Sequence, residues 1–138
     1  MKLMKLVYIA HGWNLAYLDD PLIFERVQAW QYGPVIESLY RGFKRFGNSP
    51  VTMGAFSESL PVAIDQCEPS FNILKKVWEK YSPVPALGLS SLTHKSGTPW
   101  DIIWNEQGGK DRKGAVIPDS LIQTFYKQKL ELGSERGN

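Results

Sequence analysis

The amino-acid sequence predicts a mainly α-helical fold: a compact bundle around a central N-terminal helix, with at most a small two-stranded β element. Residues 2–18 are apolar on every side of a helical wheel, which is typical of a helix buried at the centre of a domain. Residues 71–81 and 119–130 instead carry one apolar stripe each, as expected for helices packed around such a centre. The strand-like segments are shorter and fewer, so helices dominate the prediction.

The length and composition of the chain indicate one domain. It has 138 residues, 43% of them hydrophobic, with 5 Trp, 6 Tyr and 6 Phe to build a core. We expect a single domain over residues 1–130 and a frayed C-terminal tail over residues 131–138. The single cysteine, Cys67, cannot form an internal disulfide, which indicates a cytoplasmic protein.

The same composition argues against several classes of function. A net charge of +2 is too small to predict nucleic-acid binding by itself. Two histidines and one cysteine show no ligand spacing, so we expect no metal site and no cofactor. The residues around Cys67 show no signature of an activated thiol, and we expect no catalytic residues. The apolar run after Lys5 is too short for a signal peptide or a membrane helix.

The first half of the chain predicts a strand and then a helix. Residues 24–30 mix β-branched, aromatic and polar side chains, as a short strand does. Pro34 predicts the first position of a helix that runs to Phe46, because proline lacks the amide proton that this position leaves unpaired. Residues 49–68 have a weak pattern and predict a short strand near Val51 or an additional turn of helix.

The second half contains the strongest local signal. Thr98 begins a Thr-Pro-Trp-Asp run that places a cap, an N-terminal proline and a carboxylate in the order of a helix start. A short helix from Pro85 to His94 precedes it, and His94 fits an ordinary role at a helix C-terminus. Residues 107–114 predict a flexible basic loop, and Ala115–Ile117 a second short strand.

Two groups of residues are candidates for function. Inside the N-terminal helix, His11 and Asn14 form either a polar site in the core or, as is commoner, ordinary hydrogen-bonded core residues. The second group comprises a basic helix face, with the tyrosine beside it, and two large aromatic residues. The basic face is either an ordinary solvated surface, which is commoner, or a contact for an acidic partner surface. The two aromatic residues anchor a partner if exposed and otherwise pack in the core. Its members are Arg41, Lys44, Arg45, Tyr40, Trp30 and Tyr32.

A series of short motifs follows one another along the chain. They are Lys2–Ala16 (KLMKLVYIAHGWNLA), Pro21-Leu22, Ala29–Val35 (AWQYGPV), Leu39-Tyr40, Phe43 with Gly47, Leu92-Thr93-His94 before Pro99-Trp100, and Ile117-Pro118. The combination, in this order, resembles the SocA-like, or Panacea, antitoxin family, which includes phage-associated GepA-like proteins. The resemblance extends over residues 2–126.

The resemblance implies a small bacterial or prophage protein of the cytoplasm, a binding module and not an enzyme. Its partner would be a cognate toxin, encoded by an adjacent gene and neutralised by direct contact, either by steric block or by delivery to a protease. The residues alone leave an alternative, a nucleic-acid-binding regulator that uses the basic helix face and the Lys110–Lys113 loop on phosphates. A hydrolase that uses Cys67 and a histidine has the least support.

Overall fold

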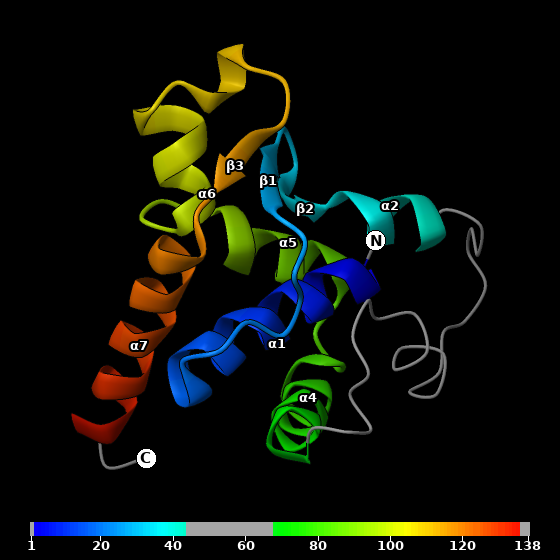
Figure 1. Ribbon diagram of the computed structural model, residues 1–138, viewed down its shortest axis with the longest axis vertical. Coiled ribbons are helices and arrows are strands. Elements are labelled where there is room, and N and C mark those ends of the chain that lie inside the picture. Colours follow the sequence, from blue (N-terminus) through cyan, green and yellow to red (C-terminus); the bar gives the residue numbers. More distant parts are fainter. Residues whose placement is uncertain (1, 44–67, 136–138) are drawn as a thin grey trace.

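The computed structural model describes residues 2–43 and 68–135 and confirms a mainly α-helical fold around a central N-terminal helix (Figure 1). This helix, α1 (Lys2–Leu18), contacts the three other long helices of the described chain. In Figure 1, α4 (Glu68–Tyr81) and α7 (Asp119–Glu135) lie on two sides of α1, and α5 (Ala86–His94) crosses near its N-terminal half. The small sheet lies at one end of this bundle.

Burial of α1 explains its all-round apolar pattern. Every residue from Leu3 to Ala16 is buried except Trp13, which is half-buried. Removal of a large aliphatic side chain from water contributes roughly 1.5–3 kcal/mol, so this helix supplies much of the stability of the domain. Gly12 allows α7 to approach closely, because a Cβ at this position would lie 2.3 Å from the ring of Tyr126.

The sheet has three antiparallel strands instead of the two predicted. They are β1 (Val27–Trp30), β2 (Gly33–Ile36) and β3 (Ala115–Ile117), in the order β2-β1-β3. The expected pairing of β1 with β3 is confirmed, with Val27 opposite Ile117. The additional strand, β2, forms a hairpin with β1 through a two-residue turn, and Trp30 faces Gly33.

The helix predicted to begin at Pro34 was placed too early. Pro34 lies in β2 opposite Ala29, and the helix α2 (Glu37–Phe43) begins three residues later. A proline is tolerated here because β2 is an edge strand and its missing amide interrupts only one side of a ladder. Gly33 has a φ of +122°, which favours glycine and turns the chain into the hairpin. The rest of the predicted helix, through Phe46, lies outside the described residues.

The predicted cap at Thr98 is confirmed. Its Oγ1 accepts a hydrogen bond from the amide of Asp101 at 3.2 Å, at the start of α6 (Pro99–Asp101). The Asp101 carboxylate accepts from the amide of Gly97 at 2.9 Å, and this bond and one from Asn105 hold the pKa of that carboxyl below its usual value. The chain continues through the π-helix η3 (Ile102–Glu106) and the 3-10 turn η4 (Gly109–Asp111).

The last helix continues past Leu130, where the sequence predicts its end, to Glu135. The predictions for Val51 and Cys67 fall outside the described residues. Among the helices that the structure does describe, none has the length and apolar character needed to span a membrane.

Candidate partner-binding surface

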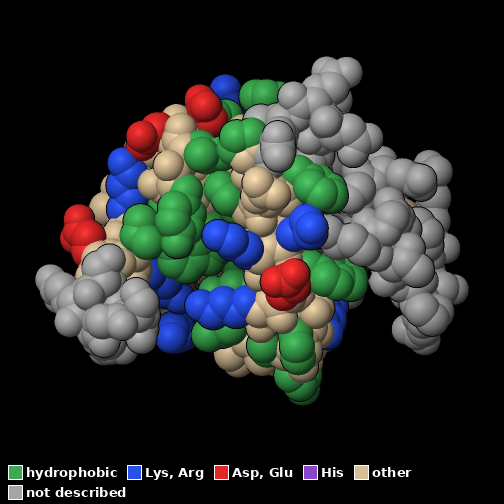
Figure 2. All heavy atoms as spheres, turned by 90° about the horizontal axis from the view of Figure 1, so that it is seen from below, with side chains coloured by type: hydrophobic (Ala, Val, Ile, Leu, Met, Phe, Trp, Pro, Cys, Tyr) green, Lys and Arg blue, Asp and Glu red, His purple; other side chains and the backbone are tan. Residues whose placement is uncertain are grey.

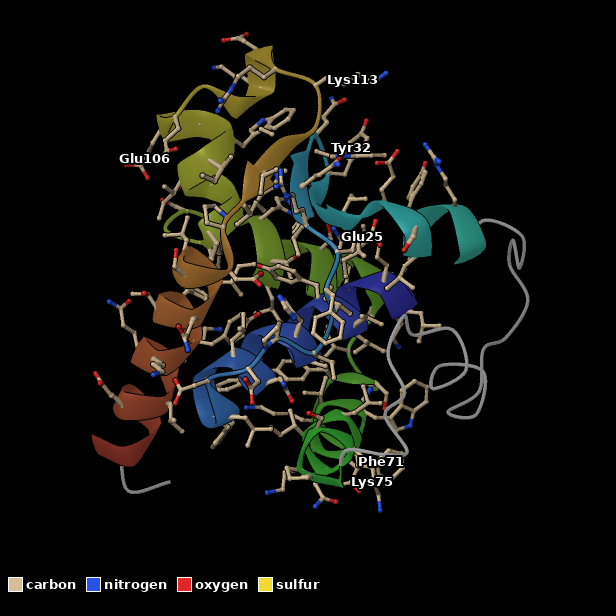
Figure 3. All side chains as sticks on the ribbon, in the orientation of Figure 1. Glu25, Tyr32, Phe71, Lys75, Glu106 and Lys113 are labelled. Atoms are coloured by element: carbon tan, nitrogen blue, oxygen red, sulfur yellow. The ribbon has the colours of Figure 1, made fainter. Side chains whose placement is uncertain are left out.

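The β1–β2 hairpin presents an aromatic side chain to solvent on a firmly held turn. Tyr32 is 76% exposed and lies at the tip of this hairpin (Figure 3). The ammonium of Lys5 donates hydrogen bonds to the carbonyl oxygens of Pro34 at 3.0 Å and Tyr32 at 3.3 Å. Ser90 in α5 donates a further, longer bond to the Tyr32 carbonyl at 3.4 Å. The backbone of the turn is therefore held by α1 and α5, and the side chain of Tyr32 is left free to contact a partner.

Lys5 is a buried cation inside the central helix. Its side chain is among the buried polar groups of the core, and no described carboxylate lies within ion-pair distance of it. Burial lowers the pKa of the Lys5 ammonium to about 8, because a low-dielectric environment disfavours the charged form. Sequence reasoning missed this role. A single lysine between Met4 and Leu6, in an apolar helix, is the signal that could have found it.

An apolar pocket of about 530 Å³ lies between the hairpin, α1, α2 and α5. Leu87, on the α5 side of the pocket, is 84% exposed, although leucine is ordinarily a core residue. Large apolar side chains gathered around a hollow mark a surface for binding another molecule. The lining residues are Met4, Lys5, Trp30, Gln31, Tyr32, Val35, Tyr40, Ala86, Leu87 and Ser90.

A second, basic hollow of about 920 Å³ adjoins the first. Trp30, Gln31 and Tyr40 line both hollows, and the Trp30 and Tyr40 ring centroids are 5.1 Å apart, so this aromatic pair forms part of the wall between them. The Trp30 indole donates to Oε1 of Gln28 at 2.8 Å, which fixes its orientation. Charged residues line the basic hollow together with these rings: Arg41, Lys110, Arg112 and Lys113 on the positive side, and Glu37 and Asp111 on the negative side.

The structure brings four of the predicted binding residues to this one surface. Trp30 and Tyr40 are half-buried, which combines the packing and binding interpretations, and Tyr32 is exposed. Arg41 is exposed and pairs with Glu37 at 2.6 Å, as its position one turn later on α2 allows. The other two predicted residues, Lys44 and Arg45, lie outside the described part of the chain.

The basic loop and the basic helix face, treated separately in the sequence, meet at the same hollow. Lys113 precedes β3 and lies at the same end of the sheet as Tyr32 (Figure 3). Gly108 before this loop and Gly114 after it both have a φ of +70°. Sequence reasoning identified the Lys110–Lys113 loop but had no means of placing it beside Arg41.

His11 and Asn14 have a structural explanation. His11 is fully buried, and its Nδ1 accepts hydrogen bonds from the amides of Leu22 at 3.2 Å and Ile23 at 3.4 Å. Its Nε2 donates to Asp119 at 2.9 Å. Asn14 donates to the carbonyl of Asp20 at 2.8 Å. The two residues fasten the segment after α1 to the core, and they do not bond to each other.

The opposite end of the molecule carries a separate group of basic and apolar side chains. Figure 2 views it from below, where Lys and Arg side chains border apolar ones over α4 and the neighbouring helix ends. Lys76 and Lys80 of α4 are exposed and line a smaller pocket of about 190 Å³ with Trp13 and Tyr17. This end lies far from the hairpin tip and provides matched positions for control substitutions.

Comparison with known proteins identifies the family. The family model for the SocA-like antitoxin, Panacea domain, matches residues 3–101, which includes the hairpin, α2 and α5. Antitoxin SocA of Caulobacter vibrioides (strain NA1000 / CB15N) is 28% identical over 144 residues, a match that covers 99% of this chain and 77% of that protein. No solved structure matches the chain. The family match spans well over half of the sequence, and the chain belongs to the SocA-like antitoxin family with a Panacea domain.

Proposed function

We propose that this protein is an antitoxin that neutralises a cognate toxin by direct contact through the surface around the β1–β2 hairpin. The observation that carries the proposal is the pairing of two exposed apolar side chains, Tyr32 and Leu87, beside an apolar pocket of about 530 Å³. Antitoxins as a family imply a toxin partner, and this surface offers Trp, Tyr and Arg side chains, the residue types enriched at binding hot spots.

The support beneath this surface favours tight binding. The hairpin backbone is held by Lys5 and Ser90, and the carbonyl of Trp30 accepts a bond from the indole of Trp100 at 2.6 Å. A surface that is already ordered loses less conformational entropy when a partner binds. The proposed binding residues are Trp30, Tyr32, Tyr40 and Arg41, joined by Leu87 and by Lys44 and Arg45 from the sequence prediction.

Co-expression tests the proposal. The gene beside the one for this protein is expressed as the candidate toxin in a bacterial host, with and without the wild-type protein or a variant. The test variant combines Tyr32→Ala with Leu87→Ser. The control is Phe24→Ala, which removes another exposed aromatic, 78% accessible, that lines neither hollow.

We expect wild type and Phe24→Ala to restore growth and to co-purify with the toxin, and the double variant to fail in both assays. Truncation of an interface anchor costs about 2 kcal/mol or more, so affinity should fall at least about 30-fold with an unchanged melting temperature. Toxin abundance in the rescued cells separates a steric block, where it persists, from delivery to a protease, where it falls. Full rescue by the double variant would contradict this assignment of the surface.

A further inference from the structure

We propose that the partner segment docking on the hairpin surface carries an apolar anchor side chain followed by acidic residues. The anchor occupies the apolar pocket beside Leu87, and the carboxylates lie over the basic hollow lined by Arg41 and the Lys110–Lys113 loop. This inference rests on the proposed function and names the chemistry of the partner at the same surface.

The two hollows are continuous enough for one segment to occupy both. Trp30, Gln31 and Tyr40 line each of them, and the two rings among these residues have centroids 5.1 Å apart. An extended chain advances about 3.3 Å per residue, so a few residues carry it from the apolar pocket across the rings. The anchor and the acidic residues therefore belong close together in the partner sequence.

The charges of the surface favour an acidic partner. Four cations line the basic hollow against two carboxylates, and one of these carboxylates, Glu37, is paired with Arg41. Lys110 and Lys113 are exposed and form no ion pair with a described residue. In the wall of the apolar pocket, the ammonium of Lys5 is bonded to two carbonyl oxygens and to no described carboxylate. The surface thus has positive charge in excess at both hollows, which attracts carboxylates and repels basic segments.

The same residues favour a polypeptide over a nucleic acid. Bases could stack on the aromatic rings of the apolar pocket, but its remaining apolar lining is aliphatic, and an apolar amino-acid side chain fits that lining better than a base does. The aliphatic lining residues are Met4, Val35, Ala86 and Leu87. An apolar anchor with neighbouring carboxylates matches both hollows.

Synthetic fluorescent peptides test the partner chemistry directly. Each contains one Leu or Trp followed by a short run of Glu, Gln or Lys, and binding to the full-length protein is measured by fluorescence anisotropy at low and high salt. We expect the Glu peptides to bind at least 10-fold tighter than the Lys peptides at low salt. This difference should shrink at about 0.5 M salt, because charges at this exposed hollow are then screened.

Charge reversal locates the effect on the molecule. The test variant combines Lys110→Glu with Lys113→Glu, and its matched control combines Lys76→Glu with Lys80→Glu on α4. Both pairs change the net charge equally, and all four side chains are exposed. We expect the test variant to weaken binding of the Glu peptides about 10-fold and the control to change it less than 2-fold. Leu87→Ser should weaken all peptides that contain the anchor.

The outcomes separate this inference from the proposed function. Equal binding of Glu, Gln and Lys peptides, or equal effects of the two charge reversals, would overturn the acidic-segment inference. Salt-sensitive binding of a single-stranded oligonucleotide that is lost in the Lys110→Glu, Lys113→Glu variant would replace it with a nucleic-acid surface. Neutralisation that needs Tyr32 and Leu87 but survives this charge reversal would retain the proposed function and refute the inference. Failure of the wild-type protein to neutralise the neighbouring toxin would count against the proposed function alone.

Discussion

The close contact between α1 and α7 makes Gly12→Ala a sharp test of the packing. A Cβ at position 12 would lie 2.3 Å from Cε2 and 2.4 Å from Cδ2 of Tyr126, far inside van der Waals contact. The ring of Tyr126 cannot easily retreat. It is 4% exposed and packs edge-on against Trp13 at 5.1 Å and Phe125 at 5.2 Å between ring centroids. The added methyl group must therefore push the two helices apart or force the ring out of its rotamer.

Two opposing effects determine how much Gly12→Ala changes the free energy of unfolding. An overpacked core costs about 1–3 kcal/mol, and a contact this short belongs at the upper end of that range. Alanine is favoured over glycine in a helix by about 1 kcal/mol, which offsets part of the cost. We therefore expect Gly12→Ala to lower the free energy of unfolding by about 1–2 kcal/mol and the melting temperature by about 3–7 °C for a chain of this size.

Urea denaturation followed by circular dichroism measures the effect, with Gly42→Ala as the control. Gly42 lies in α2, and among the described residues no atom outside its own stretch of helix lies within 4 Å of its Cβ position, so alanine there should stabilise the protein by up to about 1 kcal/mol. The two glycine substitutions should thus have opposite signs. In a Tyr126→Leu background, Gly12→Ala should lose most of its cost, because the ring that it strikes is gone. Stabilisation by Gly12→Ala in the wild-type background would refute the close approach of the helices.

Three further predictions concern single side chains. Thr98→Ala should cost about 1 kcal/mol in urea melts, because the cap on Asp101 is lost, and Thr98→Ser should retain most of it. Burial lowers the pKa of Lys5 to about 8 in the folded protein, below its value of about 10.4 when unfolded, so the unfolded state binds more protons between these pH values. The free energy of unfolding should therefore rise by about 2 kcal/mol from pH 8 to 10, and melts of Lys5→Met over the same range should lack this contribution. His11→Ala leaves the buried amides of Leu22 and Ile23 without their acceptor and should cost at least about 2 kcal/mol, whereas an unchanged urea midpoint would contradict the role assigned to this imidazole.

Features with local causes could be predicted from the sequence. Residues 2–18 are apolar in every direction, and only a central position buries all of them. The cap at Thr98 needs no partner outside its own turn, since the acceptor and donor are three residues apart. Predictions of this kind succeeded because the sequence window that contains the pattern also contains the interaction.

Features with distant causes could not be predicted. Pro34 suits the first turn of a helix, yet it lies in β2, because β1 pairs with this segment and Lys5 binds its carbonyl. The basic hollow joins Arg41 to Lys113 across most of the chain, and no local pattern relates the two. Leucine is ordinarily a core residue, yet Leu87 is 84% exposed, because α5 packs its other face against α1 and the sheet.

The atoms that hold the hairpin in place differ from the side chains that would contact a partner. Lys5, Ser90 and Trp100 hold the hairpin through the backbone carbonyls of Tyr32, Pro34 and Trp30, which every residue type possesses. The exposed side chains of Tyr32 and Leu87 take no part in that support. Substitutions of Tyr32 or Leu87 should therefore change which partner is bound, while the hairpin keeps its position. Loss of Lys5, in contrast, should weaken the binding of every partner.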